Sequence, residues 1–441
     1  SKGIKSRKRG EPIRFVYDKE MPKDLLRKLT ERLNVDKNDT RVAGGRYHNF
    51  KDLMKFPDCG RSDLKYPAWP PVFKQELNGT ESILRLIRKQ DRSLHYPYQS
   101  FDTVIRVLRE AAISKEVKSI KMTLYRLAKD SKVVKALICA AQNGKKVTVF
   151  VELKARFDEE NNLATAEMMK SAGIKIIYSL PGLKVHAKVA LVRRKSINED
   201  NKICDYAYIG TGNFNEKTAT LYADCGLFTC NPKITKDLHT LFQTLQGKEN
   251  SKFSTLLVAR FNLIPELNRL IDHEIELAEK GKGGRIILKM NGLQDPSMID
   301  RLYEASQRGV QIDLIVRGIC CLIPGQTYSR NIRVTRIVDT FLEHARVWYF
   351  GNGGNPKVYS GSPDWMRRNL YRRIEAVVPI LDPDLREEMI DMLNIQLSDN
   401  RKACFVDDRL QNVFKGKTRG EGIRAQYTFY NYLKKKNEIS L

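Results

Sequence analysis

Hydrophobic residues follow two different spacings along the chain, and together these spacings predict an α/β protein. Short apolar runs at 120–122, 147–152, 174–177 and 286–288 are bounded by polar turns and are interpreted as strands. Segments at 131–137 and 297–302 lie between such runs and are interpreted as helices. Over 185–192 apolar residues alternate with others, which puts His186 and Lys188 on one face of a predicted strand.

The same series of segments occurs twice, which predicts a duplicated architecture. The matching pairs are 120–122 with 286–288, 131–137 with 297–302, 142–144 with 307–309, 147–152 with 310–317, 174–177 with 332–334, 185–188 with 343–346, and 209–213 with 360–364. Each half reads strand, helix, strand, helix, strand with a histidine, and strand. We therefore expect two α/β repeats, each with a largely buried sheet.

The histidine segments carry residues suited to phosphate chemistry. An imidazole can attack phosphorus, while an ammonium and an amide hold its oxygens, and His186, Lys188 and Asn213 supply these groups beside a glycine-rich turn. A single His-x-Lys is a common surface pattern in a lysine-rich protein. The second copy, His344 with Arg346, turns the pattern into a candidate site.

Further cations follow the predicted strands. Arg126 ends the first strand, Lys154 and Arg156 follow the second, and Arg317 of the second half takes the place of Glu152. Ligands of α/β sheets collect beyond the carboxyl ends of strands, where arginines clamp phosphate oxygens in pairs. A helix expected over 216–222 would aim its amides at bound phosphate. Tyr222 fits either a core aromatic or a nucleotide contact.

Charge narrows the class of partner. The 441 residues hold 78 Lys and Arg against 52 Asp and Glu, a net charge of +26. Such an excess points to a polyanion, and nucleic acid, an anionic membrane and inorganic polyanions all fit. No apolar run reaches the ~18 residues of a membrane span. The eight scattered cysteines lack CxxC spacing, so we expect reduced thiols of a cytoplasmic protein, with neither zinc nor disulfides.

Other segments complete the expected outline. A strand is predicted over 12–17, a helix over 22–33, and a linker over 67–71. A helical connection over about 252–280 is expected to join the repeats, and a strand over 376–380 leads into a helix over 383–397. The tail from residue 401 is expected to be solvated and partly helical.

Long motifs beyond the histidines resemble a known family. The segments 124–126, 151–160, 182–188, 209–219, 316–318 and 342–347 are similar to the first polyphosphate kinase family, the long-chain polyphosphate synthases, within the phospholipase D-like superfamily. The similarity covers nearly all of residues 70–400. It implies two phospholipase D-like α/β repeats related by pseudo-two-fold symmetry, over 71–262 and 263–441. Residues 1–70 resemble the end of a head domain, so a piece of a longer family member is expected.

The resemblance also implies roles for particular residues. His186 would be the nucleophile that becomes phosphohistidine, and His344 the general acid or base. Tyr222 and Arg317, with His344, would contact the nucleotide, whereas Arg126 and Arg156 would lie near phosphate-bound Mg²⁺. Superfamily logic adds Lys188, Asn213 and Arg346 as ligands of phosphate oxygens, and Lys154 is a further nucleotide-binding candidate.

The expected reaction is reversible transfer of the γ-phosphoryl group of ATP to the end of inorganic polyphosphate, with ADP as product. Magnesium is expected as cofactor, and the protein is expected to be a cytoplasmic homo-oligomer. Nucleic acid is not an expected partner, and peripheral membrane association stays open. A phospholipase D-like phosphodiesterase or nuclease is the alternative. A nucleic-acid-binding protein would explain the charge but not the two histidine motifs.

Overall fold

The computed structural model describes residues 14–33, 35, 40–46, 53, 56, 57, 59–79, 81–125, 128, 130–152, 159–178, 184–194, 204–416 and 422–439. The chain divides into two compact units, Ser1–Ala68 and Trp69–Leu441. In the described part of the chain no helix is both long and apolar enough to span a membrane.

The first unit is small. Strands β1 (Arg14–Asp18) and β2 (Thr40–Gly44) pair in parallel, and α2 (Lys23–Arg32) connects them. A short 3₁₀ turn, η2 (Ser62–Leu64), follows. The predicted strand over 12–17 and helix over 22–33 are confirmed within a residue or two at their described ends.

The second unit contains two large mixed sheets. Among the described residues, the first sheet has the order β15-β10-β9-β8-β4-β5-β6, and β3 also pairs with β10. Its strands are β3 (Arg92–Tyr96), β4 (Val117–Leu124), β5 (Lys146–Val151), β6 (Lys175–Tyr178), β8 (Lys188–Arg194), β9 (Cys204–Gly210), β10 (Tyr222–Thr229) and β15 (Leu342–Glu343). Strands β4, β5 and β6 run parallel, whereas β8 and β9 are antiparallel to their neighbours.

The second sheet repeats this plan in the order β11-β19-β17-β16-β12-β13-β14-β20-β21. Its strands are β11 (Leu257–Val258), β12 (Arg285–Met290), β13 (Gln311–Val316), β14 (Ile332–Ile337), β16 (Arg346–Phe350), β17 (Lys357–Gly361), β19 (Ala376–Pro379), β20 (Ala403–Val406) and β21 (Asn412–Phe414). Strands β12, β13 and β14 are parallel, and β16 and β17 are antiparallel. The predicted duplication is therefore confirmed strand by strand.

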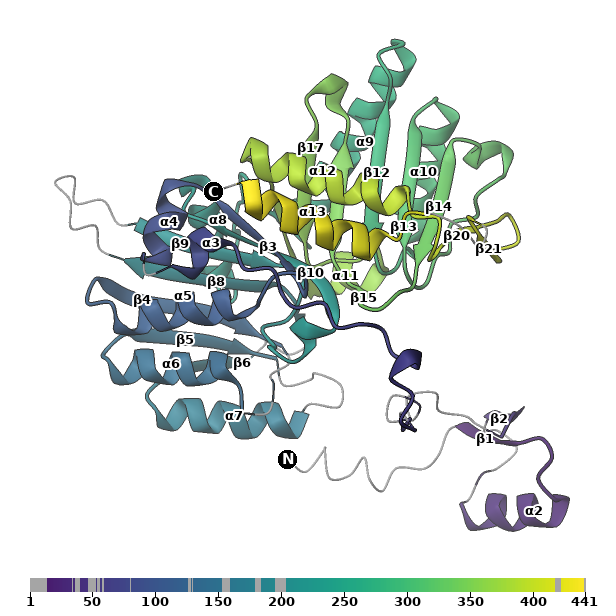
Figure 1. The fold of residues 1–441 in the computed structure, drawn as a ribbon, viewed down its shortest axis with the longest axis horizontal. Coiled ribbons are helices and arrows are strands. Elements are labelled where there is room, and N and C mark those ends of the chain that lie inside the picture. The colour runs from purple at the N-terminus through teal and green to yellow at the C-terminus, as the bar shows by residue number, and fades with distance from the viewer. Residues whose placement is uncertain are drawn as a thin grey trace. The chain divides into compact units, whose positions relative to one another are not determined.

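Helices cover the outer faces and fill the centre (Figure 1). They are α3 (Gln75–Asn78), α4 (Ile83–Lys89), α5 (Asp102–Ile113), α6 (Lys132–Gln142), α7 (Glu159–Ser171), α8 (Pro232–Thr244), α9 (Leu263–Glu279), α10 (Pro296–Gln307), α11 (Arg367–Arg372), α12 (Pro383–Leu397) and α13 (Ala425–Ile439), with 3₁₀ turns η3 (Thr218–Thr220), η4 (Thr327–Ser329) and η5 (Asn352–Gly354). Helices α4 to α7 contribute to the core on one face of the first sheet, and α9 and α10 to the core on one face of the second. A third core joins α8, α12 and α13 to the facing sides of both sheets.

The repeats exchange short strands. Strand β7 (Lys184–Val185) of the first repeat pairs with β18 (Arg373–Ile374) of the second, while β15 of the second pairs with β10 of the first. Each exchanged segment directly precedes a histidine. Because these pairings join one repeat to the other, both histidines lie at the boundary between the two repeats.

The prediction of one continuous strand over 185–192 is wrong near its beginning. The backbone leaves the strand at His186 and Ala187, and β8 begins at Lys188. The N–H groups of His186 and Ala187 both donate to the carbonyl of Ile374, at 2.9 and 3.0 Å. Pairing with the other repeat therefore redirects the chain at the histidine.

Three further expectations change. The helix predicted over 252–280 begins only at Leu263, because Leu257 and Val258 pair with β19. The helix expected over 216–222 is only the 3₁₀ turn η3, so it presents no long stack of amides. The tail is not a solvated end, since it adds β20 and β21 to the second sheet and buries one face of α13. The helix predicted over 383–397 is confirmed as α12.

Candidate active site

His186 is held by a carboxylate from the other repeat. Its Nδ1 lies 2.9 Å from Oε2 of Glu375, and 12% of the imidazole is exposed whereas the Glu375 side chain is fully buried. Ser362 donates its hydroxyl to the same carboxylate oxygen, and the Asn369 amide donates to the other at 2.7 Å. With these donors in place, Glu375 is fixed as an acceptor for an Nδ1–H group.

His344 repeats the arrangement with the roles of the repeats reversed. Its Nδ1 lies 2.8 Å from Oδ1 of Asp224, a residue of β10 in the first repeat, and 16% of the imidazole is exposed. The Thr211 hydroxyl donates to the same oxygen at 2.5 Å. The N–H groups of His344 and Ala345 both donate to the Ala223 carbonyl. Each imidazole is thus positioned by the repeat to which it does not belong.

These hydrogen bonds occupy Nδ1 of each ring, and Nε2 of His344 also lies 3.3 Å from Nη1 of Arg346. Nδ1 must carry the proton that the carboxylate accepts, so Nε2 keeps a lone pair while the ring is neutral. Burial lowers the pKa of His186 to about 3, in spite of the opposing attraction of Glu375. Burial likewise lowers the pKa of His344, against Asp224. Both rings are therefore neutral near pH 7 and able to act as nucleophile or base.

A cation stands two residues after each histidine. Lys188 donates from Nζ to the His186 carbonyl at 2.5 Å, and Arg346 donates from Nη1 to the His344 carbonyl at 2.7 Å. Burial, together with the charges of Arg346 and Arg373, lowers the pKa of Lys188 to about 7 against the attraction of Glu375. The charge of Lys188 also acts on the pKa of both histidines, so the two half-sites share one electrostatic environment.

The residues expected to contact a nucleotide gather around His344. The ring centroids of Tyr222 and His344 are 5.2 Å apart. Arg317 donates from Nε to the carbonyl of Glu343 at 2.6 Å and to Oδ1 of Asn291 at 3.0 Å. The Asn291 amide in turn donates to the His344 carbonyl at 3.0 Å. The structure therefore places Tyr222 against the ring of His344, and Arg317 against the backbone just before His344.

Three predicted cations, Arg126, Lys154 and Arg156, lie outside the described residues. The structure brings together His186, His344, Lys188, Arg346, Tyr222 and Arg317. Asn213 lies on the turn after β9, three residues beyond Gly210, which pairs with Lys188. In the described ranges no three His, Cys, Asp or Glu side chains gather as metal ligands.

Sequence reasoning missed the two carboxylates that position the histidines. A signal for them was present, because Thr211 and Asp224 are thirteen residues apart and so are Ser362 and Glu375. Each hydroxyl lies within the segment that the duplication had already matched, 209–213 or 360–364. The turn also has a packing reason for glycine, since a Cβ at Gly212 would overlap the carboxylate of Asp224.

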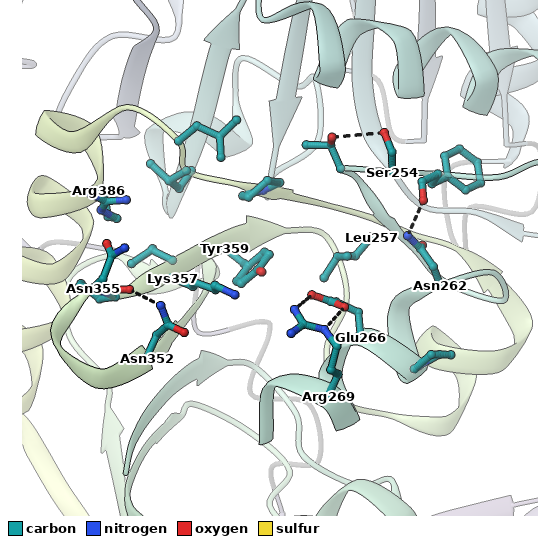
Figure 2. Close-up of a pocket in the computed structure, with 18 residues that line it drawn as sticks. Ser254, Leu257, Asn262, Glu266, Arg269, Asn352, Asn355, Lys357, Tyr359 and Arg386 are labelled. Atoms are coloured by element: carbon teal, nitrogen blue, oxygen red, sulfur yellow. Dashed lines mark hydrogen bonds and ion pairs between the residues drawn. The ribbon is translucent and has the colours of Figure 1, made fainter. Parts of the chain in front are cut away.

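A separate cavity of about 630 Å³ lies at the far end of strands β17 and β19 (Figure 2). Glu266 and Arg269 form an ion pair beside it, with Nε 2.8 Å from Oε2, and Lys357, Tyr359 and Arg386 also line it. Its lining contains none of the predicted site residues. This cavity is therefore separate from the candidate site around the paired histidines.

The duplicated sheets and crossed histidines define a two-repeat α/β fold with one histidine half-site in each repeat. Phosphatidylserine synthase from Haemophilus influenzae Rd KW20 shares this fold, with a TM-score of 0.52 and 10% identity over 80% of this chain and 94% of that one. Residues 1–56, 82–251 and 256–426 match the family models for the polyphosphate kinase middle domain, C-terminal domain 1 and C-terminal domain 2. The chain belongs to the polyphosphate kinase family.

Relatives with this family name match almost the whole chain. The polyphosphate kinases of Yersinia pestis and Escherichia coli K12 are 44% and 43% identical over 98% of it. The crystal structure of polyphosphate kinase from Porphyromonas gingivalis has a TM-score of 0.89 and 47% identity, covering 98% of this chain and 66% of that one. The chain spans 63% of the length of the two curated relatives. The family resemblance and the fold class expected from the sequence are both confirmed.

Proposed function

We propose that this chain carries the phosphotransfer site of a polyphosphate kinase, which moves the γ-phosphoryl group of ATP to the end of inorganic polyphosphate and back. One observation carries the proposal most directly: two neutral imidazoles, each with its Nδ1 bound to a buried carboxylate of the other repeat, lie in one cationic environment. Family membership supplies the donor and acceptor, because the matched relatives are named polyphosphate kinases.

The transfer proceeds in two displacements at phosphorus. The Nε2 lone pair of His186 attacks the γ-phosphorus, the bond to the β,γ-bridging oxygen breaks, and its electron pair leaves with ADP. A terminal oxygen of polyphosphate then attacks the same phosphorus, and the N–P electron pair returns to Nε2. Glu375 accepts the Nδ1–H bond throughout and stabilises the positive charge that forms on the ring. His344 exchanges a proton with the entering or leaving oxygen.

Cations stabilise the spread negative charge of such a transition state more than covalent chemistry does. Lys188 and Asn213 would hold phosphoryl oxygens at His186, and Arg346 would fix His344. Tyr222 and Arg317 would contact the nucleotide beside His344. Bound with ATP, magnesium would neutralise phosphate charge; Arg126, Arg156 and Lys154 are proposed to lie at those phosphates.

The direct test is the phosphoenzyme. Incubation of the protein with Mg²⁺ and γ-labelled ATP should give acid-labile, alkali-stable label at His186, and added polyphosphate should discharge it. His186→Ala should still unfold cooperatively in urea and take no label. His344→Ala should slow both labelling and discharge. Label retained in the folded His186→Ala protein would show that another residue is the nucleophile.

A phospholipase D-like phosphodiesterase or nuclease would use the same histidines differently. It would hydrolyse bis(p-nitrophenyl) phosphate or nucleic acid without ATP. The same protein preparation should therefore lengthen polyphosphate with ATP and leave these diesters intact. Diester hydrolysis that His186→Ala abolishes, without chain elongation, would replace the kinase proposal.

The remaining expectations are also proposals. We propose a head-domain remnant over 1–70 and catalytic repeats over 71–262 and 263–441, and the three consecutive domain matches support this division. We propose a cytoplasmic homo-oligomer, which light scattering would test. The net charge of +26 supports reversible binding to anionic membranes, which sedimentation with phosphatidylglycerol vesicles would test.

A further inference from the structure

The two half-sites are matched in backbone but not in charge. Lys188 pairs with Gly210 across β8 and β9, and Arg346 pairs with Gly361 across β16 and β17. Three residues after these glycines stand Asn213 in the first repeat and Asp364 in the second. Equivalent positions therefore hold a neutral amide in the first repeat and a carboxylate, paired with Arg346, in the second.

Asp364 binds the Arg346 guanidinium along its edge. The Nε atom of Arg346 lies 3.1 Å from Oδ1 and Nη2 lies 3.0 Å from Oδ2, with both side chains buried. The backbone N–H of Asn291 donates to Oδ1 at 2.8 Å and fixes the carboxylate. Since Nη1 donates to the His344 carbonyl, each nitrogen of this guanidinium already has a partner.

Lys188 has no such counterion. Within the described ranges, no carboxylate oxygen lies within 4 Å of its Nζ, which donates a hydrogen bond to the His186 carbonyl. The carboxylates with the strongest effect on Lys188 are Glu375 and Asp224, which hold the imidazoles. Arg346 experiences the same two and Asp364 as well. The Oδ1 atom of Asn213 is buried and finds no hydrogen-bond partner among the described residues.

We propose that the contrast between Asn213 and Asp364 decides which of the two imidazoles accepts the phosphoryl group. Lys188 keeps its donors for phosphoryl oxygens beside His186, whereas Asp364 neutralises Arg346 beside His344, so that the ion pair there offers a phosphoryl dianion no net positive charge. His186 therefore becomes the nucleophile, and His344 is kept for proton transfer. This inference rests on the proposed phosphotransfer function and adds the residue pair that assigns its two histidine roles.

Isosteric substitutions test the contrast. Asn213→Asp adds a carboxylate without changing shape, and Asp364→Asn removes one. Phosphoryl occupancy of His186 and His344 would be measured by peptide mass spectrometry at alkaline pH, with two donors. The first is Mg-ATP. The second is phosphoramidate, whose P–N bond breaks to release ammonia when an imidazole nitrogen attacks, so labelling needs no nucleotide contact.

Asn213→Asp should reduce label at His186 by about tenfold or more, because a buried charge is only weakly screened inside a protein. Asn213→Ala, which removes the amide without adding charge, should lose much less label than Asn213→Asp. The double substitution Asn213→Asp with Asp364→Asn should shift label toward His344. Urea midpoints of each variant verify folding, and should Asn213→Asp not fold, His186→Gln with Asp364→Asn must gain label at His344.

The outcomes separate the two proposals. Wild-type label at His186 from phosphoramidate but not from Mg-ATP would remove the kinase proposal and leave the charge contrast to be judged on the variants. Equal losses in Asn213→Asp and Asn213→Ala, or label at His186 that no substitution changes, would overturn the inference. Wild-type protein that takes no label at His186 from either donor would overturn it as well.

Discussion

A buried carboxylate behind an imidazole determines which ring nitrogen can react. Glu375 accepts from Nδ1 of His186 and is itself held by Ser362 and Asn369. Burial opposes its ionisation, but His186, Lys188 and Ser362 together lower the pKa of Glu375 to about 2. The carboxylate is therefore ionised throughout the working pH range and acts as a positioning residue.

Glu375→Gln should consequently slow phosphorylation of His186 by about 10²- to 10⁴-fold, because an amide can stabilise the wrong tautomer of the ring. The ¹⁵N chemical shifts of His186 should show this change of tautomer, while the KM for ATP stays nearly constant. Glu266→Gln, at the separate cavity, is the matched control and should change neither quantity. An unchanged tautomer in Glu375→Gln would assign the carboxylate a purely structural role.

The lowered pKa of Lys188 makes folding stability depend on pH, and the sign of this dependence follows from the direction of the pKa shift. The unfolded side chain binds its proton up to a pKa of about 10.4, whereas burial lowers the folded pKa to about 7. Between these values the unfolded chain holds more protons, so the contribution of Lys188 to folding stability rises with pH across this window.

Lys188→Met should therefore be more stable than wild type at pH 7, by a margin in urea midpoint that shrinks toward pH 10. Lys236→Met, which removes a charge from the exposed face of α8, controls for charge loss alone. A margin that stays constant with pH would contradict the depressed pKa of Lys188.

At the scale of elements, pattern and duplication predicted much of the fold. The strands and helices of both repeats follow apolar periodicity, and α12 has the predicted bounds. Two of the failures share one cause, which is pairing between distant segments. The chain breaks at His186 because β7 pairs with β18, and Leu257 leaves the predicted helix because β11 pairs with β19. Local periodicity carries no record of such partners.

Helix α13 is a further element that the sequence analysis misjudged, because one face of this charged helix is buried in the core. Phe429 is 2% exposed and packs its ring edge-on against Tyr98, with centroids 5.4 Å apart. Phe429→Ala should cost about 3–5 kcal/mol of unfolding free energy. Lys434→Ala on the exposed face should change it by no more than about 0.5 kcal/mol. Urea denaturation measures both, and similar small losses would mean that α13 does not belong to the core.

At the scale of the whole molecule, the net charge of +26 affects the binding of anionic partners more than it affects the fold. Polyphosphate binding should weaken by about tenfold or more between about 50 and 200 mM NaCl, because bound cations displace condensed counterions. Binding of inorganic triphosphate, which meets fewer cations, should weaken less. Isothermal titration calorimetry measures both, and equal salt slopes would confine the polyanion contact to the reactive centre.

Because the two exchanged strands cross between the repeats, the repeats should not function when they are produced as separate proteins. Either half produced alone would present an imidazole whose ring orientation depends on a carboxyl group left behind on the missing piece. Neither half should then be a weaker version of the enzyme; both should be inert. Catalysis should reappear only when separately expressed halves reassemble, so complementation between them would report directly on the strand exchange.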